Sequence, residues 1–327
     1  MINTKVRVGV IYHKNNQFLT GNHLDNTYYN FFVKAFQRNP NIDVVYYPTD
    51  DVFDATILKN KVDAVLLWSN AAFGMPNKIY GLEKLSLPVI ARAGDPEDAK
   101  ESLSRHDEWK IDHYFHFIPE SYFYKLYPKS FKYKKIIFGL ESELYLNVVP
   151  FKNRIKNRIL NSGNAGKNTF INKLICYIRD RSTRNPYIGY KLRTMCNKLS
   201  YVDYTPSLNH KYINDEYPNL LQKYASAIAA TSDTPSIKYF EIPAAGCLTF
   251  MEITEKNRGN YLGYTDGKNA IFINEKNYKK KFEEYLSDTD NPKWEEIAQE
   301  GRKYALVNFN NDQAVSSLVK LISELTR

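Results

Sequence analysis

The stretch Ser236-Ile-Lys-Tyr-Phe-Glu-Ile-Pro-Ala-Ala-Gly-Cys247 decides the fold that we predict for this chain of 327 residues. Runs of small and apolar residues flank it at 225–231 and 247–251, and each run is long enough for one buried strand. Between them the sequence predicts a helix, with Thr234 as its N-cap and Gly246 at its end. Pro243 removes one helical hydrogen bond, so this helix should be short or kinked.

Lys238 and Glu241 are three residues apart and therefore share one face at the N-terminal end of this helix. One interpretation is an exposed ion pair of small energetic value. The other places both side chains on a ligand, because open α/β sheets bind nucleotides outside the carboxyl ends of their parallel strands. Both interpretations are compatible with the spacing.

The first half of the chain alternates apolar runs with helical segments. The predicted strands are 6–12, 44–47, 62–68, 87–92 and 111–117, with a further one at 136–139, and the predicted helices are 25–38 and 52–61. This alternation is typical of a doubly wound parallel sheet. His113 and His116 would point to opposite faces of their strand, so we do not expect them to share a metal.

Length and composition limit the class of protein. A chain of this size with 43% hydrophobic residues fits two domains, and we predict their boundary near Pro150. The three cysteines lack the short spacing of a zinc site. The first residues lack the apolar core of a signal peptide, and no apolar run approaches the roughly 20 residues of a membrane span. We therefore expect a soluble cytoplasmic protein.

Positive charge is concentrated in residues 151–200. This segment has twelve Lys or Arg side chains and one acid, Asp180, whereas the whole chain has a net charge of +9. Its residues 158–166 predict a strand that runs into a glycine loop, and a glycine loop before a helix is a natural phosphate cradle. The helix that follows has one apolar face, made by Phe170, Ile171, Leu174, Ile175 and Ile178.

One nucleoside diphosphate does not need twelve cations. Four explanations of the excess positive charge stay open: a solvated basic face, an anionic membrane surface, a lipid-diphosphate acceptor and nucleic acid. We rank nucleic acid last because no nucleic-acid module is visible. A membrane contact through Arg179, Arg181 and Arg184 should be purely electrostatic, since no amphipathic anchor accompanies the charges. The protein would then be peripheral at the membrane.

The sequence Phe240-Glu-Ile-Pro-Ala-Ala-Gly246, preceded by a polar loop and a basic residue, resembles the donor site of group-1 (family 4-like) retaining nucleotide-sugar glycosyltransferases. That resemblance implies the GT-B fold: two Rossmann-like α/β domains with parallel sheets that face a cleft. Residues 1–150 would form the acceptor side and residues 151–327 the donor side. The last helix would cross back to the N-terminal domain.

The resemblance also implies roles for individual residues. Glu241 matches the second glutamate of the family's E-x7-E motif and would hold the nucleotide ribose, while Asp233 stands in place of the first, near the transferred sugar. The implied catalytic residues are Asp233, Lys238 and His116. The implied donor-binding residues are Glu241, Ser236, Gly163, Asn164 and Arg193.

The implied reaction transfers a sugar from a nucleotide-sugar donor to a glycan or lipid-linked acceptor, with retention, without metal and without a cofactor. Helix N-termini with Lys and Arg can neutralise a leaving diphosphate without a metal. Two alternatives stay open. One is a nucleotide-sugar epimerase of the same fold, and the other is a non-catalytic protein that binds a nucleotide-sugar or a polyanion.

Overall fold

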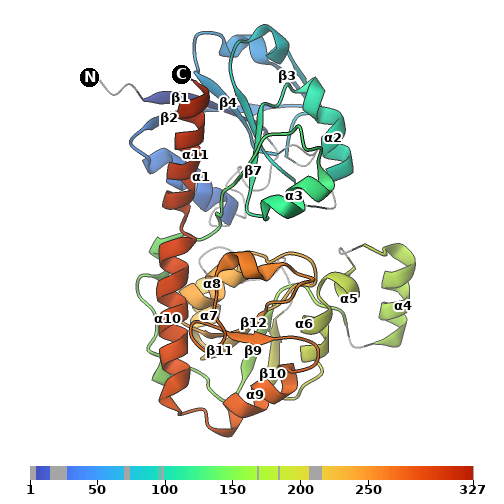
Figure 1. Ribbon diagram of the computed structural model, residues 1–327, viewed down its shortest axis with the longest axis vertical. Coiled ribbons are helices and arrows are strands. Elements are labelled where there is room, and N and C mark those ends of the chain that lie inside the picture. Colours follow the sequence, from blue (N-terminus) through green and yellow to red (C-terminus); the bar gives the residue numbers. More distant parts are fainter. Residues whose placement is uncertain are drawn as a thin grey trace. The chain divides into compact units, whose positions relative to one another are not determined.

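The computed structural model describes residues 5–14, 28–69, 74–94, 96, 99–167, 169–182, 185–205 and 216–326. The chain forms two compact units (Figure 1). Unit 1 comprises Met1–Gly139 with Asn310–Arg327, and unit 2 comprises Leu140–Phe309. The division therefore falls shortly before Pro150. Among the described residues, no helix is both long and apolar enough to cross a membrane.

Unit 1 is built on a parallel sheet of six strands in the order β2-β1-β4-β6-β7-β8. These strands are β1 (Val6–His13), β2 (Ile42–Thr49), β4 (Ala64–Leu67), β6 (Val89–Arg92), β7 (His113–His116) and β8 (Tyr133–Lys135). Its helices are α1 (Tyr28–Arg38), α2 (Ala99–Glu108), α3 (Glu120–Leu126) and α11 (Asn311–Leu325). The predicted parallel α/β architecture is confirmed.

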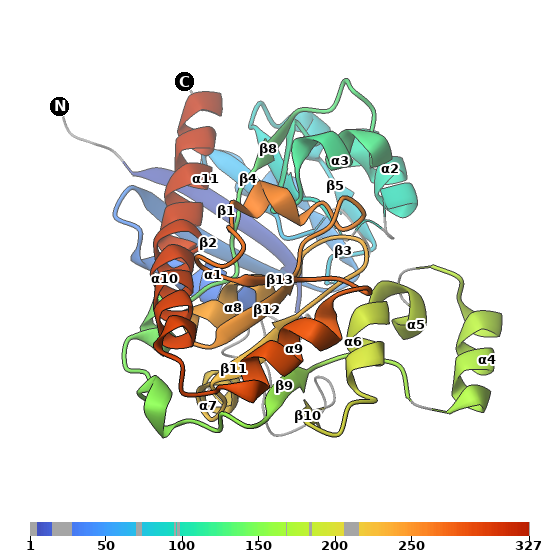
Figure 2. The same cartoon turned by 60° about the horizontal axis from the view of Figure 1, so that its bottom comes forward.

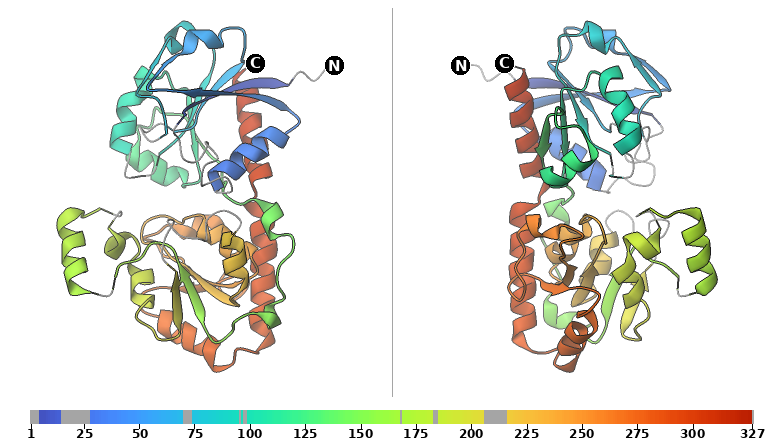
Figure 3. Two further views of the ribbon diagram at one scale, coloured as in Figure 1. Left: turned by 180° about the vertical axis from the view of Figure 1, so that it is seen from behind. Right: turned by 45° about the vertical axis from the view of Figure 1, so that its right-hand side comes forward.

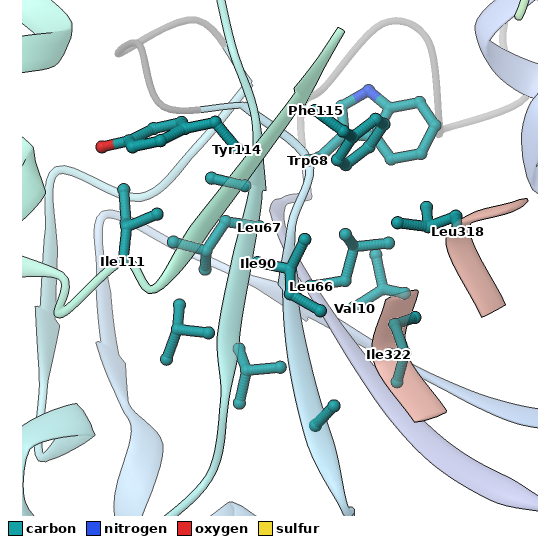
Figure 4. Close-up of a cluster of buried hydrophobic side chains, with 14 of the residues drawn as sticks. Val10, Leu66, Leu67, Trp68, Ile90, Ile111, Tyr114, Phe115, Leu318 and Ile322 are labelled. Atoms are coloured by element: carbon teal, nitrogen blue, oxygen red, sulfur yellow. The ribbon is translucent and has the colours of Figure 1, made fainter. Parts of the chain in front are cut away.

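Helix α11 packs on unit 1, as predicted for the last helix. Leu318 and Ile322 lie beside Val10 and Leu66 in the core of this unit (Figure 4). The side chain of Arg38 in α1 donates to Asp312 in α11 at 2.7 Å. Burial of these apolar side chains joins the end of the chain to its beginning.

Two local predictions in unit 1 are wrong. Residues 52–61 form strand β3 (Val52–Asp54) and a 3-10 turn (Ala55–Leu58) instead of a helix. Strand β3 pairs with β5 (Lys78–Tyr80), so a contact distant in sequence overrides the local pattern. The strand predicted at 136–139 does not form, and strand β8 lies just before that position.

Unit 2 contains a parallel sheet of five strands in the order β10-β9-β11-β12-β13. They are β9 (Ile159–Ser162), β10 (Val202–Thr205), β11 (Ser226–Ala229), β12 (Leu248–Glu252) and β13 (Ile271–Ile273). The helices are α4 (Phe170–Arg179), α5 (Pro186–Gly189), α6 (Lys191–Cys196), α7 (Glu216–Gln222), α8 (Lys238–Ala244), α9 (Tyr278–Ser287) and α10 (Pro292–Asn308). Figure 2 shows α8 and α10 together beside β12.

Helix α8 is the short helix predicted between the two apolar runs at 225–231 and 247–251, but it begins later than predicted. Its N-cap is Ile237, not Thr234, because the Thr231 hydroxyl donates to the carbonyl of Thr234 at 2.6 Å and holds the chain in a turn. The helix ends at Ala244, and Gly246 two residues later has a φ of +75°, the left-handed conformation that glycine adopts readily. Tyr239, Phe240 and Ile242 are fully buried in unit 2.

Helix α4 lies at the edge of unit 2, next to α5, in all views (Figure 3). Its apolar face is exposed, whereas apolar faces of surface helices normally point to the core. The half-buried side chains of this helix are instead those of Asn172, Cys176 and Tyr177. The basic segment therefore contains an amphipathic helix with an exposed apolar face, which we did not expect from the sequence.

Candidate functional site

A glycine loop follows strand β9 at the carboxyl edge of the sheet in unit 2. Gly163 has a φ of +92°, its N–H donates to the carbonyl of Thr205 at 2.8 Å, and its own carbonyl accepts from the Tyr204 hydroxyl at 3.0 Å. A Cβ at this position would lie 2.9 Å from Cε of Lys238 and 3.1 Å from Nη2 of Arg193. Only glycine therefore lets these two cationic side chains reach the loop.

Lys238 is the first residue of α8, and its ammonium group turns to this loop. Nζ donates to the Tyr217 hydroxyl at 2.8 Å and to Oγ of Ser162 at 3.3 Å, and these two hydroxyls lie 2.8 Å apart. Nζ also lies 4.4 Å from the centre of the Tyr217 ring, a cation–π distance. These contacts hold the amine in one place at the end of β9.

Arg193 in α6 supplies the second cation. Its side chain is 1% exposed, Nε donates to Oδ1 of Asn161 at 3.0 Å, and Nη2 donates to the carbonyl of Ser162. The guanidinium also lies over the Tyr190 ring. Burial lowers the pKa of Arg193, but a guanidinium stays charged at any physiological pH.

These two cations contact neutral groups within the part of the chain that the structure describes. Burial and the charge of Arg193 lower the pKa of Lys238, while the charge of Glu241 raises it. Burial in turn raises the pKa of the Glu241 carboxyl, and Lys238 opposes that effect. Buried cations that lack a bonded carboxylate are costly, and an anionic ligand would relieve that cost.

The other predicted residues of unit 2 lie on the loops around this cluster. Asp233 accepts from Arg258 at 2.9 Å through its carboxylate and at 3.0 Å through its carbonyl, so its side chain is part of an ion pair. Ser236 is half-buried before α8, and Asn164 is exposed in the glycine loop. The structure thus brings Gly163, Arg193 and Lys238 together.

His116 belongs to unit 1, where it ends strand β7. It is 1% exposed, and burial and the charge of Arg92 hold its pKa well below the usual range, so the ring is neutral. Its Nδ1 accepts from the N–H of Ile118 at 3.4 Å. This histidine lies at the carboxyl edge of the unit 1 sheet, beside Arg92 at the end of β6.

Sequence reasoning missed the hydroxyl groups that position Lys238. Tyr217 is one of 26 tyrosines and follows a segment outside the described residues, so no local pattern distinguishes it. It also missed Glu252, a 6% exposed acid at the end of β12 whose pKa burial raises to about 8. Among the described residues, no three His, Cys, Asp or Glu side chains are grouped as metal ligands would be.

Comparison with known protein families identifies part of the chain. Residues 184–320 match the family described as "Glycosyl transferase-like". The match contains α8 and its flanking strands, so the predicted resemblance to glycosyltransferases, and with it the prediction of such an enzyme, is confirmed over this region. No curated protein sequence matches this chain.

Solved structures share the fold over nearly the whole chain. HepE from Anabaena, solved in complex with UDP and glucose, has a TM-score of 0.57 and 10% identity, with 98% of this chain and 100% of HepE covered. A glycosyltransferase from Rickettsia africae has a TM-score of 0.59 and 12% identity, with 99% of this chain and 99% of that structure covered. Sucrose-phosphate synthase from Thermosynechococcus elongatus has a TM-score of 0.60 and 10% identity, with 98% of this chain and 99% of the synthase covered. The predicted GT-B fold class is confirmed.

Proposed function

We propose that this protein transfers a sugar from a nucleoside-diphosphate sugar to a glycan or lipid-linked acceptor, with Gly163, Arg193, Lys238 and Glu241 holding the donor. Uridine diphosphate is the nucleotide that we test first, because HepE was solved with UDP. The family match over residues 184–320 supports the reaction class. The proposal rests on this match and on the site itself.

The observation that carries the proposal is the approach of two half-buried or buried cations to one glycine. Arg193 and Lys238 lie within 3.1 Å and 2.9 Å of the position that a Cβ of Gly163 would occupy. Their other partners are neutral hydroxyl, amide and carbonyl groups. A diphosphate would supply negative charge in direct contact with both cations, and charge-assisted hydrogen bonds to it are strong.

Glu241 follows Lys238 by one helical turn and is half-buried. In our proposal its carboxylate accepts hydrogen bonds from the ribose hydroxyls, while Lys238 and the backbone of Gly163 contact the phosphates. Negative charge grows on the leaving diphosphate during transfer, and cations already in place stabilise that charge. Asp233 and Ser236 would lie nearer the sugar on the adjacent loops.

We propose that the transfer proceeds without metal, because Arg193 and Lys238 can neutralise the leaving group. Turnover should therefore persist in excess EDTA, because a chelator leaves both cations in place beside the leaving group. Donor consumption measured with and without chelator checks this expectation. Loss of turnover that manganese or magnesium restores would contradict it.

The ion pair of Asp233 with Arg258 favours one alternative, a protein that binds the nucleotide-sugar without transferring the sugar. A thermal-shift screen of uridine, guanosine and thymidine diphosphates first identifies the nucleotide. Donor consumption by the wild type and by Lys238→Met then separates the two functions. Nucleotide binding with hydrolysis that Lys238→Met reduces supports the enzyme, whereas binding without any donor consumption supports the binding protein.

A further inference from the structure

Helix α4 has an exposed apolar face that no other helix of the described chain matches. Five of the fifteen exposed large apolar side chains of the described residues lie on its ten residues. They are Phe170 (81% exposed), Ile171 (70%), Leu174 (53%), Ile175 (40%) and Ile178 (74%). The other ten are scattered over the rest of the chain, as is normal for a soluble surface.

The orientation of α4 is fixed by contacts at both ends. At its start, Tyr187 of α5 packs on Gly166, where a Cβ would come within 2.5 Å of the ring. After its end, the Asn185 side chain donates to the carbonyl of Asp180 at 2.8 Å. Tyr177 stacks with Tyr187 at 6.3 Å between ring centres. The polar side of α4 therefore faces α5, and the apolar side faces solvent.

Cations border this apolar face. On a helix of 3.6 residues per turn, Arg179 falls next to Ile175 at one edge of the face, while Lys173 lies beyond Tyr177 on the other side. Both are exposed, as are Lys167 before the helix and Arg181 after it. Arg184 lies outside the described residues. Asp180 is the only acid in residues 151–200, and its carboxylate accepts from the N–H of Ser182 at 2.7 Å.

We propose that α4 is an interfacial helix that binds an anionic membrane, with Phe170, Ile171 and Ile178 inserted among the lipids. Apolar residues on one side and Lys or Arg beside them are the pattern of helices that lie in the plane of a membrane surface. A second copy of the chain would cover the apolar face equally well, but it would bring a second set of cations next to the first. An anionic surface instead neutralises the four exposed cations.

This proposal goes beyond the donor site and does not depend on it. From the sequence we expected a purely electrostatic contact with the membrane, whereas the contact proposed here also buries apolar side chains. Raising the salt concentration should therefore weaken membrane binding without abolishing it, because screening acts on the charges and not on the buried apolar area. A contact made by charges alone would disappear at high salt.

The test uses Phe170→Trp as a probe of insertion. The three native tryptophans, Trp68, Trp109 and Trp294, are each at most 3% exposed, so a new tryptophan at position 170 dominates any change in fluorescence. Vesicles of phosphatidylglycerol mixed with phosphatidylcholine should shift its emission to shorter wavelength, and pure phosphatidylcholine should shift it far less. Absence of a shift with anionic vesicles at low salt overturns the proposal.

A matched pair of variants locates the contact. Ile171→Glu with Ile178→Glu should weaken sedimentation with anionic vesicles by more than about tenfold, since it removes two apolar side chains from the lipid. Ile57→Glu with Leu146→Glu changes two other exposed apolar residues in the same way and should leave binding unchanged. Circular dichroism confirms that both double variants fold.

Other occupants of the α4 face give different results. If the wild type dimerises without lipid and Ile171→Glu with Ile178→Glu makes it monomeric while vesicles do not bind, the face is an interface between two copies. If the wild type binds a single-stranded oligonucleotide but not vesicles, the partner is nucleic acid. Either result overturns the membrane proposal. Uridine diphosphate binding by the α4 variant is measured separately, so failure of the donor site is not confused with failure of the anchor.

Discussion

Helix α8 buries Phe240 completely, whereas α4, in the same unit, leaves Phe170 81% exposed. Both phenylalanines lie on helices whose apolar residues recur at helical spacing. The Phe240 ring packs on Phe309 with ring centres 4.5 Å apart, while α4 packs mainly on the short helix α5 within the described chain. Helical spacing of apolar residues thus defines a face but does not tell what the face will contact.

The arginines of residues 151–200 also differ in exposure, as the two phenylalanines do. Arg193 is 1% exposed and bonded to Asn161 and Ser162, whereas Arg179 and Arg181 are exposed beside the apolar face of α4. One segment of sequence therefore supplies a buried cation to the proposed donor site and further cations to the outer surface. We propose that its net charge serves two separate roles, of which only the first needs a nucleotide.

The largest difference between the two helices should appear in stability. We expect Phe240→Ala to lower the free energy of unfolding by about 3–5 kcal/mol, because it leaves a cavity in a packed core. Phe170→Ala should change it by less than about 0.5 kcal/mol, as for other exposed residues. Urea denaturation followed by circular dichroism measures both. Equal losses would mean that the face of α4 is buried in solution.

The two arginines give the next test. Arg193→Met removes the donor to Oδ1 of Asn161 and to the carbonyl of Ser162, so the free energy of unfolding should fall by about 2–3 kcal/mol. Arg179→Met should leave it unchanged within about 0.5 kcal/mol, because the residue is exposed. Thermal unfolding of the two variants provides the comparison. A larger effect of Arg179→Met would contradict the assignment of Arg193 to the site.

The smallest effect is an uptake of protons. Burial and Arg193 lower the pKa of Lys238, and a diphosphate beside the amine would raise it again. At about pH 8, above the lowered pKa, binding of uridine diphosphate should therefore take up a fraction of a proton. Calorimetric titrations in buffers with different ionisation enthalpies measure this fraction. It should vanish in Lys238→Met, and a release of protons by the wild type would contradict the placement of the diphosphate.

The parallel sheets could be predicted because buried strands leave long apolar runs in the sequence. Val65 and Ile228 lie at 0% exposure within such runs. Strand β3 was missed because its pairing with β5 depends on a segment further along the chain. The start of α8 was missed because the hydroxyl of Thr231 holds the preceding turn, a contact that helical capping preferences do not contain.

The side-chain cluster at the carboxyl edge of the unit 2 sheet could be predicted in part. Lys238, Glu241 and Gly163 were singled out because a helix start and a glycine loop have recognisable sequence patterns, and their roles on a donor stay predictions. The hydroxyl groups of Tyr217 and Ser162, which hold the amine of Lys238, left no pattern because they come from separate elements. The exposure of α4 was also missed, since an apolar face looks the same whether it meets a sheet or a membrane.

The most direct test of the account is a calorimetric titration of uridine diphosphate into three proteins. These are the wild type, Glu241→Ala, and the double variant Ile171→Glu with Ile178→Glu. Loss of a charged hydrogen bond worth about 1.5–3 kcal/mol predicts that Glu241→Ala weakens binding about tenfold or more, while the α4 variant binds as the wild type does. Equal affinity of the wild type and Glu241→Ala would contradict the donor site that we propose.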